Sequence, residues 1–313
     1  MMAFSANEAA FEGFRIVRRE PGTIVIWGVL HLVLGLASVF LIVPFMGPIM
    51  QLAQTQPGAP KLNAAQSLAL LANAARLYAL ILPLYLAVAA VYTCAVYRAV
   101  LRPTDKGFGR LRLGADELRM VVVWIALGLI LMVSTIVLVV IAVLAAGMIA
   151  AATGGKGAGA TAAIILAVIA AYAAALAFAL WLGVRLSLAG PMTFAERRVR
   201  LFASWGLTRR RFWSLFGCYL LAFVFLTIIS LVSLTIYGAI STVATGSITE
   251  AAKSIFTPDL SSVKAYLSPA RVAYLVFSGF LGAIYYAVGV APAAAAYRAL
   301  VPVNPQNQAE VFD

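Results

Sequence analysis

Residues 120–155 read MVVVWIALGLILMVSTIVLVVIAVLAAGMIAAATGG, without one Asp, Glu, Lys or Arg. A bilayer core about 30 Å thick needs about 20 apolar residues in a helix, so this run is long enough to cross it. Five more uncharged runs occupy residues 21–60, 77–97, 157–184, 212–249 and 272–297. The sequence therefore predicts an all-α integral membrane protein, a single domain over 1–313, with six transmembrane helices at approximately 23–50, 75–98, 120–150, 160–184, 212–242 and 272–297.

Composition agrees with this class, because 64% of the 313 residues are hydrophobic and 11% are charged, whereas a soluble domain has about 25% charged residues. Of the 23 Lys and Arg residues, 17 fall before the first run, in every second connection and after the last run. By the positive-inside rule this asymmetry places both termini in the cytoplasm. The net charge of +12 is thus a topology signal, and we expect no nucleic-acid partner, since the basic residues adjoin helix ends and not a soluble module.

The ends of the runs resemble one another. Tryptophans, which favour the membrane interface, lie at or near the predicted cytoplasmic entries, at Trp27, Trp124, Trp205 and Trp213. The even-numbered runs return to arginines, at Arg98, Arg185 and Arg298. We interpret the chain as three tandem transmembrane hairpins, each preceded by a cytoplasmic interfacial helix. The alternative is that any polytopic protein places such residues at its interfaces.

The segment before the fifth run is the most basic in the chain. At 100° per residue, residues 194–205 gather Phe194, Leu201 and Trp205 on one face, and Thr193 and Glu196 have capping-box spacing. This pattern predicts a basic amphipathic helix in the cytoplasmic interface. Its arginines and those that follow are candidate contacts for anionic lipid headgroups, with nonspecific lipid contact and topology determination as the alternative: Arg197, Arg198, Arg200, Arg209, Arg210 and Arg211.

Alanines recur at four-residue spacing along the fourth run: Ala163, Ala167, Ala171, Ala175 and Ala179. Side chains this small let a second backbone approach closely, and such packing largely drives helix association in lipid. We expect this ridge to pack on another helix of the same bundle; an oligomer interface is the alternative.

Reactive groups are scarce inside the runs. His31 is the only histidine of the chain, and the cytoplasmic acids lie beside arginines, as helix caps and surface ion pairs do. Hydrolytic or transfer chemistry needs paired carboxylates, a metal cluster or a nucleophile with its base. We therefore predict no enzyme, no cofactor and no metal site.

The stretch at 185–217 starts with RLSLAGP at 185–191 and ends with ASWGLTRRRFWSLFG at 203–217, which carries an SW-x-LT-x-x-x-FW pattern. It resembles the recurrent signature of YciC-type bacterial inner-membrane proteins and of the membrane domain attached to some glycerophosphodiester phosphodiesterases. The resemblance implies a multipass inner-membrane protein with ties to lipids. It does not imply phosphodiesterase activity, because in those fused enzymes the catalytic domain is a separate soluble barrel with acidic metal ligands.

These observations favour a non-catalytic multipass protein of the bacterial inner membrane, acting as a lipid-associated scaffold, anchor or partner subunit. The alternative is an uncoupled permease or lipid-translocating protein, which needs no buried carboxylate. A polar cavity at the midplane favours transport, whereas a solid Ala and Leu core favours the scaffold. Membrane lipids are the expected partners; a membrane-protein partner and a homo-oligomer both stay open. Residues 303–313 form a polar C-terminal tail.

Overall fold

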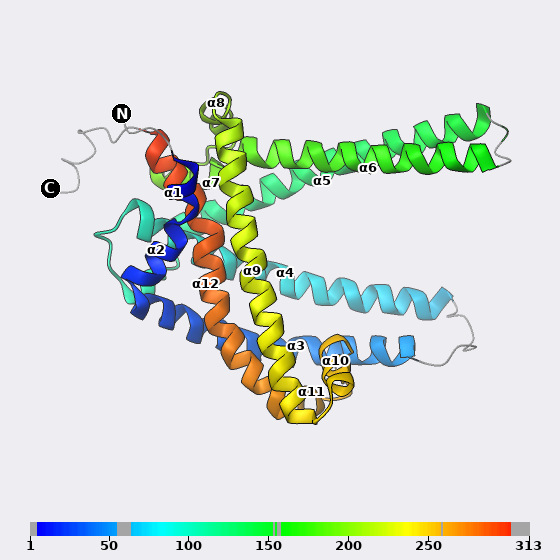
Figure 1. Cartoon of the computed structure of the whole chain (residues 1–313), viewed down its shortest axis with the longest axis horizontal. Helices are drawn as coiled ribbons and strands as arrows, with labels where there is room; N and C mark the ends of the chain where they lie inside the picture. The colour runs from blue at the N-terminus through cyan, green and yellow to red at the C-terminus, as the bar shows by residue number, and fades with distance from the viewer. Residues whose placement is uncertain (1–4, 55–63, 153, 155–157, 258, 302–313) are drawn as a thin grey trace. The chain divides into compact units, whose positions relative to one another are not determined.

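The computed structural model describes residues 5–54, 64–152, 154, 158–257 and 259–301, so the predicted tail at 303–313 lies outside it. The structure is 87% helical, and the residues in these ranges form no strand. Six of their helices are long and apolar enough to cross a membrane (Figure 1): α3 (Pro21–Gln54), α4 (Ala64–Leu101), α5 (Ala115–Ala152), α6 (Ala158–Leu186), α9 (Phe212–Thr245) and α12 (Pro269–Leu300). The predicted all-α membrane class is confirmed.

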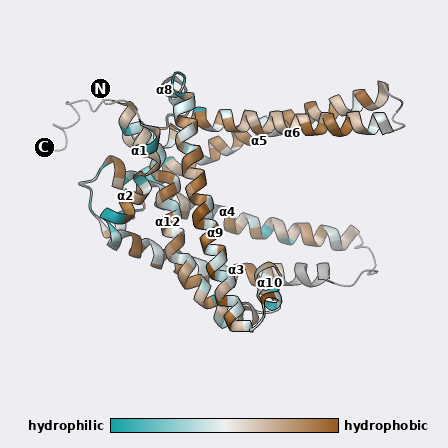
Figure 2. Cartoon of the chain, viewed as in Figure 1, coloured by the Kyte–Doolittle hydropathy of each residue, from teal (hydrophilic) through white to brown (hydrophobic). Residues whose placement is uncertain are grey.

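The six helices contain 29 to 38 residues each, more than the roughly 20 that a bilayer core requires. A helix suits lipid because it pairs every interior backbone N–H and C=O within the segment. Two hydroxyl side chains of α5 are also paired within the helix: Ser134 donates to the Ile130 carbonyl at 2.7 Å, and Thr135 donates to the Leu131 carbonyl at 2.8 Å. These two side chains therefore add no unpaired polar group to α5, and Figure 2 colours most of α5 and α6 brown or white.

The chain folds into two compact units, each built from segments that are separate in the sequence. Among the described residues, the first unit holds 5–6, 114–217 and 296–301, and the second holds 7–113 and 218–295. The single six-helix domain and the threefold hairpin repeat stay predictions.

The first unit is built on the helical hairpin α5–α6. Two short helices follow α6, namely α7 (Ala189–Glu196), which packs on α5, and α8 (Ala203–Thr208), which packs on α6. Most large apolar side chains along the hairpin are exposed, as expected of a surface that faces lipid.

One amphipathic helix over 194–205 was expected, and this expectation is wrong. The chain leaves helical geometry after Glu196, where Arg197 adopts a left-handed conformation with φ of 54°, and α8 begins only at Ala203. Thr193 lies inside α7 and is fully buried, and its hydroxyl accepts a hydrogen bond from the Arg200 backbone N–H at 3.0 Å. This bond closes the loop that replaces the middle of the predicted helix.

The second unit contains α1 (Ala6–Ala10), α2 (Glu12–Arg19), the 3-10 turn η1 (Phe108–Arg110), α10 (Ile248–Phe256) and α11 (Val263–Tyr266) beside its long helices. α2 approaches α12 closely, because a Cβ atom at Gly13 would lie 2.4 Å from the Cα atom of Val288. On α9, Phe225 lies 5.2 Å edge-on from Phe14, measured between ring centroids. The residues of α2 are thus packed against two long helices.

α3 and α12 also cross at short range. A Cβ atom at Gly279 would lie 2.9 Å from the Gly28 carbonyl oxygen, and one at Gly28 would lie 2.5 Å from the Phe280 ring. Small residues at a crossing let two backbones meet, which is how helices gain contact area in lipid.

Candidate functional site: a basic aromatic pocket

The segment with the SW-x-LT pattern is tied to the end of α6. The hydroxyls of Ser204 and Thr208 each lie 3.2 Å from the carbonyl oxygen of Arg185. Each hydroxyl shares its proton with a local carbonyl, that of Leu201 at 2.9 Å from Ser204 and that of Trp205 at 3.3 Å from Thr208. Ser204 and Thr208 are both fully buried. Arg185 is in the last turn of α6, where backbone carbonyls have no partner within the helix. The two hydroxyls satisfy this carbonyl and hold α8 against α6.

Aromatic rings surround the side chain of the same arginine. Trp205 stands edge-on to Trp181, with ring centroids 5.1 Å apart. The guanidinium carbon of Arg185 lies 5.7 Å from the centroid of each of three rings, those of Trp181, Trp205 and Phe212. Ring faces attract a cation, and they do so more strongly where water is excluded. We call these three rings with Arg185 the arginine cage.

The cage leaves part of the guanidinium without a hydrogen-bond acceptor. The Nε and Nη1 atoms of Arg185 are buried, and neither has a hydrogen-bond partner among the described residues. The residue as a whole is half-buried and lines an open pocket of about 430 Å³. Arg209, Arg210 and Arg211 bring three more guanidinium groups to its wall, with Trp213 and Ser214 beside them.

The pocket contains no negative charge of its own. Its lining has four arginines and no Asp or Glu, and in the described part of the chain no carboxylate forms an ion pair with any of the four. Arginine presents a planar fork of N–H donors that matches phosphate and carboxylate oxygens. This arrangement can bind an anion; its lining offers no His, Cys or carboxylate as an acid or base.

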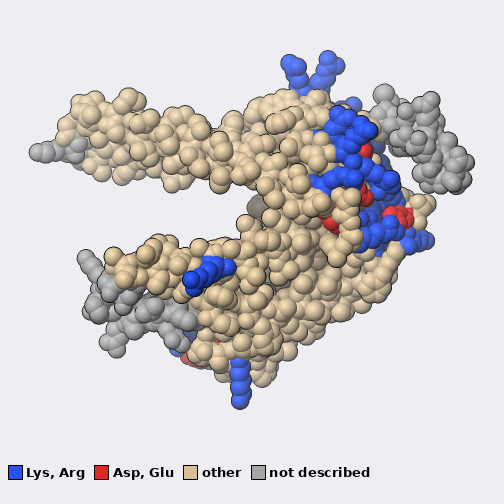
Figure 3. Space-filling view, turned by 180° about the vertical axis from the view of Figure 1, so that it is seen from behind, with Lys and Arg blue, Asp and Glu red and all other residues tan. Residues whose placement is uncertain are grey.

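The structure separates the six predicted headgroup arginines into two sets. Arg209 to Arg211 line the pocket, whereas Arg197, Arg198 and Arg200 are exposed on the connection between α7 and α8. Arg200 also pairs with Glu196 at 3.0 Å, which offsets part of its charge. In Figure 3 the α5–α6 hairpin is tan along nearly its whole length.

Sequence reasoning missed Arg185 and Trp181 as members of a site. Arg185 was interpreted as the arginine at which a hairpin returns and as the first residue of the YciC-like stretch. The available signal was local, since Trp181 and Arg185 are four residues apart and share one face of α6. Their contact with Trp205 depends on how α8 folds back, which spacing alone does not give.

The four predicted interfacial tryptophans occupy different environments. Trp213 is 77% exposed beside the pocket, Trp205 is a wall of the cage, and Trp124 is half-buried on α5. Trp27 lies fully buried inside the second unit, instead of facing headgroups. Its indole Nε1 donates to the Gly109 carbonyl at 2.7 Å, and its own carbonyl accepts from the Tyr92 hydroxyl at 2.8 Å.

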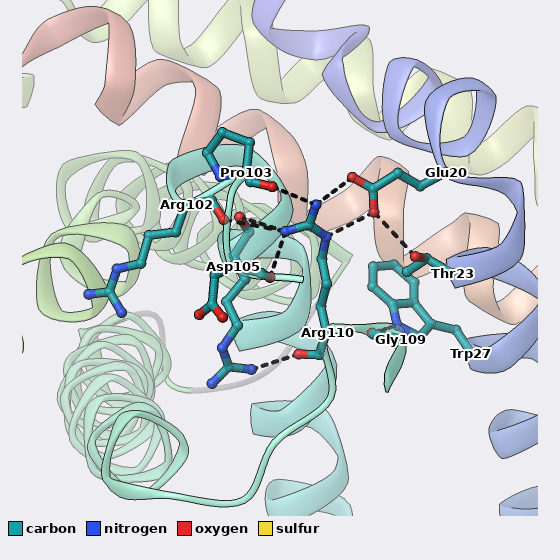
Figure 4. Close-up of polar contacts among 9 residues, drawn as sticks. Glu20, Thr23, Trp27, Arg102, Pro103, Asp105, Gly109 and Arg110 are labelled. Carbon is teal, nitrogen blue, oxygen red and sulfur yellow. Dashed lines mark hydrogen bonds and ion pairs between the residues drawn. The ribbon is translucent and has the colours of Figure 1, made fainter. Parts of the chain in front are cut away.

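An ion pair lies next to this buried tryptophan (Figure 4). The Arg110 side chain is 4% exposed and donates to both carboxylate oxygens of Glu20, at 2.8 and 2.7 Å. It also donates to the carbonyls of Pro103, at 3.1 Å, and Asp105, at 3.0 Å. The hydrogen bonds from Arg110 hold the pKa of the Glu20 carboxyl below its usual value of 4.5. The Arg110 guanidinium finds all of these acceptors within the chain, so we interpret the ion pair as structural.

The alanine ridge of α6 faces α5. All five alanines are half-buried while most of their neighbours are exposed. Two of them, Ala171 and Ala175, line a hollow of about 290 Å³ together with Thr135, Leu138 and other residues of α5. The small side chains thus lie at the contact between the two helices of the hairpin.

A second pocket lies within the second unit, between the middle parts of α9 and α12. It measures about 370 Å³, and its lining includes Ser230, Ser233, Ser278, Tyr274 and Tyr285. This groove has hydroxyl groups at the centre of helices that are otherwise apolar.

His31 lies close to this groove, against Gly282 at its wall. A Cβ atom at Gly282 would lie 2.8 Å from the imidazole of His31. The imidazole packs against the rings of Tyr92 and Tyr286, and its buried Nδ1 has no hydrogen-bond partner among the described residues.

The residues described contain no group of three or more His, Cys, Asp or Glu side chains placed to hold a metal ion. Helix content and apolar length define the chain as an all-α multipass membrane protein. Comparison with family models, with curated proteins and with solved structures finds no match to this chain. The resemblance to YciC-type proteins therefore stays a prediction.

Proposed function

We propose that this chain is a non-catalytic, lipid-associated protein of the bacterial inner membrane, with both termini in the cytoplasm, that serves as a scaffold, anchor or partner subunit. The observation that carries the proposal is the basic pocket, in which four arginines meet no carboxylate from the described parts of the chain. Membrane-crossing helix α9 starts at Phe212, directly after Arg211, so these charges lie at the depth of the headgroups.

Anionic lipids supply the charge that the pocket lacks. Each basic residue near a leaflet rich in anionic lipid contributes about 1 kcal/mol of attraction. The exposed tryptophan beside the pocket, Trp213, presents an apolar ring and a polar N–H, which suits the boundary between acyl chains and headgroups. A lipid whose phosphate enters the pocket meets both features.

Native mass spectrometry of the full chain, extracted in mild detergent with its lipids, tests this proposal. We expect adducts of anionic phospholipid to persist at collision energies that strip phosphatidylethanolamine. Equal retention of anionic and zwitterionic lipids, or no retained lipid, contradicts it. Reconstituted protein that moves solutes or lipids well above an empty-liposome control contradicts the scaffold role.

The groove between α9 and α12 favours a second candidate function, an uncoupled permease or lipid-translocating protein. Two serines from the middle of α9 line it, with Tyr274, Ser278 and Tyr285 of α12. A polar surface there gives a hydrophilic group a path that lipid does not. Dithionite quenching of fluorescent lipids in proteoliposomes measures such translocation. We expect the double substitution Ser230→Ala and Ser233→Ala to slow it if the groove is the path; unchanged rates exclude the groove.

A further inference from the structure

We propose that Arg185, held in the arginine cage, is the residue that binds a phosphate group in the basic pocket, an inference that rests on the lipid association proposed above. The SW-x-LT-x-x-x-FW pattern then has a physical role: it builds the cage and fixes its arginine. The pattern contributes two hydroxyls, two cage rings and the tryptophan beside the pocket.

Arg185 differs from the other arginines of the pocket in what surrounds it. Arg209, Arg210 and Arg211 are exposed to solvent and can be hydrated. Two guanidinium nitrogens of Arg185 are instead buried without any acceptor among the described residues. Nη2 is the guanidinium nitrogen that is not buried in this way, so an anion meets Arg185 there. Its charge offsets part of the cost of holding a largely dehydrated cation in the cage.

The guanidinium is also fixed in position before any ligand arrives. Three ring faces limit its movement, and the backbone of the same residue is held by Ser204 and Thr208. A side chain that is already ordered loses little entropy on binding, which raises affinity. The exposed arginines that precede α9 provide charge around a position that Arg185 defines.

Phosphate is the anion that fits this set of donors best. Nη2 of Arg185 can donate to one phosphate oxygen, and three further arginines line the pocket around the remaining oxygens. A pocket of about 430 Å³ has room for the phosphate and a small polar headgroup. A single carboxylate would leave most of the positive charge without a partner.

The phosphate can belong to a membrane lipid or to a soluble ester, and the two sources are separated by experiment. The full-length chain in nanodiscs of phosphatidylcholine is titrated with phosphatidylglycerol and, in a separate arm, with sn-glycerol 3-phosphate. Wild type is compared with Arg185→Gln and Arg185→Lys. The control is Arg18→Gln, an exposed arginine of α2 that lies outside the pocket.

We expect Arg185→Gln to weaken binding of the preferred ligand about tenfold, the loss of one charged hydrogen-bonding pair. Arg185→Lys keeps the charge but loses the planar group that the three rings hold in place, so we expect a smaller but clear loss. Arg18→Gln should change affinity less than twofold. Circular dichroism of each variant establishes that it is folded. If Arg185→Gln does not fold, the comparison of wild type with Arg185→Lys still tests the role of Arg185.

The outcomes separate the two proposals. Phosphatidylglycerol binding that depends on Arg185 supports both. Phosphatidylglycerol binding that Arg185→Gln and Arg185→Lys leave unchanged overturns the role of Arg185 and leaves the lipid association standing. Binding of glycerol 3-phosphate that depends on Arg185, without lipid binding, supports the phosphate site and contradicts the lipid association. No binding in either arm overturns both.

Discussion

Arg110 and Glu20 are 90 residues apart in the sequence and form a two-pronged ion pair, with nitrogen to oxygen distances of 2.8 and 2.7 Å. Glu20 directly precedes α3, and Arg110 ends the 3-10 turn between α4 and α5. The pair therefore joins two connections that the sequence separates by a complete helical hairpin. Geometry of this kind makes an ion pair stronger than a typical surface contact.

Replacing Glu20 with Gln should destabilise the chain by about 1–3 kcal/mol, because it leaves a buried guanidinium without its counter-charge. Thermal unfolding in detergent measures this with a thiol-reactive dye, since both cysteines, Cys94 and Cys218, are buried in the folded chain. Glu250→Gln is the matched control: it breaks an exposed ion pair with Lys253 and should cost less than about 1 kcal/mol. Equal losses of stability in the two variants would show that the buried ion pair contributes no more than the exposed one.

Acid should remove the advantage of the Glu20 carboxylate. Its pKa is lowered in the folded chain, so its contribution to stability is present above pH 4.5 and is lost as pH falls through the lower folded value. We expect the difference in Tm between wild type and Glu20→Gln to be constant from pH 7 to pH 5.5 and to shrink below pH 4.5. A difference that persists unchanged to pH 3 contradicts this account.

Gly109 should not tolerate a side chain. Its φ is +56°, and a Cβ atom there would lie 2.7 Å from the Cγ2 atom of Ile26. We expect Gly109→Ala to lower the free energy of unfolding by about 1–2 kcal/mol. Gly22→Ala is the control, since nothing lies within 4 Å of the added atom and alanine favours a helix. Its Tm should stay the same or rise.

Removing one hydroxyl should loosen α8. Thr208→Val keeps the shape of a fully buried side chain and deletes the hydroxyl that the Arg185 and Trp205 carbonyls share. The expected cost is about 1 kcal/mol, seen as faster hydrogen exchange over 203–208. Thr227→Val is the control, because that exposed hydroxyl only bonds within its own helix. Unchanged exchange in Thr208→Val would show that the hydroxyl does not hold α8.

Membrane orientation can be tested with single cysteines, because the native thiols are buried. We expect Arg198→Cys to be protected from a membrane-impermeant maleimide in intact spheroplasts and to react after lysis. Glu250→Cys, in α10 on the predicted outer side, should react in both conditions. The opposite labelling pattern would place both termini outside the cytoplasm. Equal labelling of the two residues in intact spheroplasts would contradict the prediction that they lie on opposite sides of the membrane.

The sequence by itself determined the class of protein and the number of long apolar helices. Length, apolarity and absence of charge are properties of a contiguous segment, so they can be counted without knowing what the segment touches. The predicted positions of the spans depended only on such counts, and each predicted range lies within one of the six long helices. The cluster of consecutive arginines from Arg209 to Arg211 was likewise identified by counting residues along the sequence.

Tertiary structure decided where the aromatic and basic side chains of each helix end are placed. Trp27 and Trp213 both lie near the start of an apolar run. Trp27 is nevertheless fully buried against Gly109, whereas Trp213 is 77% exposed. Residues 194–205 have helical periodicity, but the buried hydroxyl of Thr193 accepts from Arg200 and the helix ends between them. Arg185 became part of a site only because α8 folds back on α6. These outcomes depend on contacts between distant segments, and periodicity within one segment does not specify them.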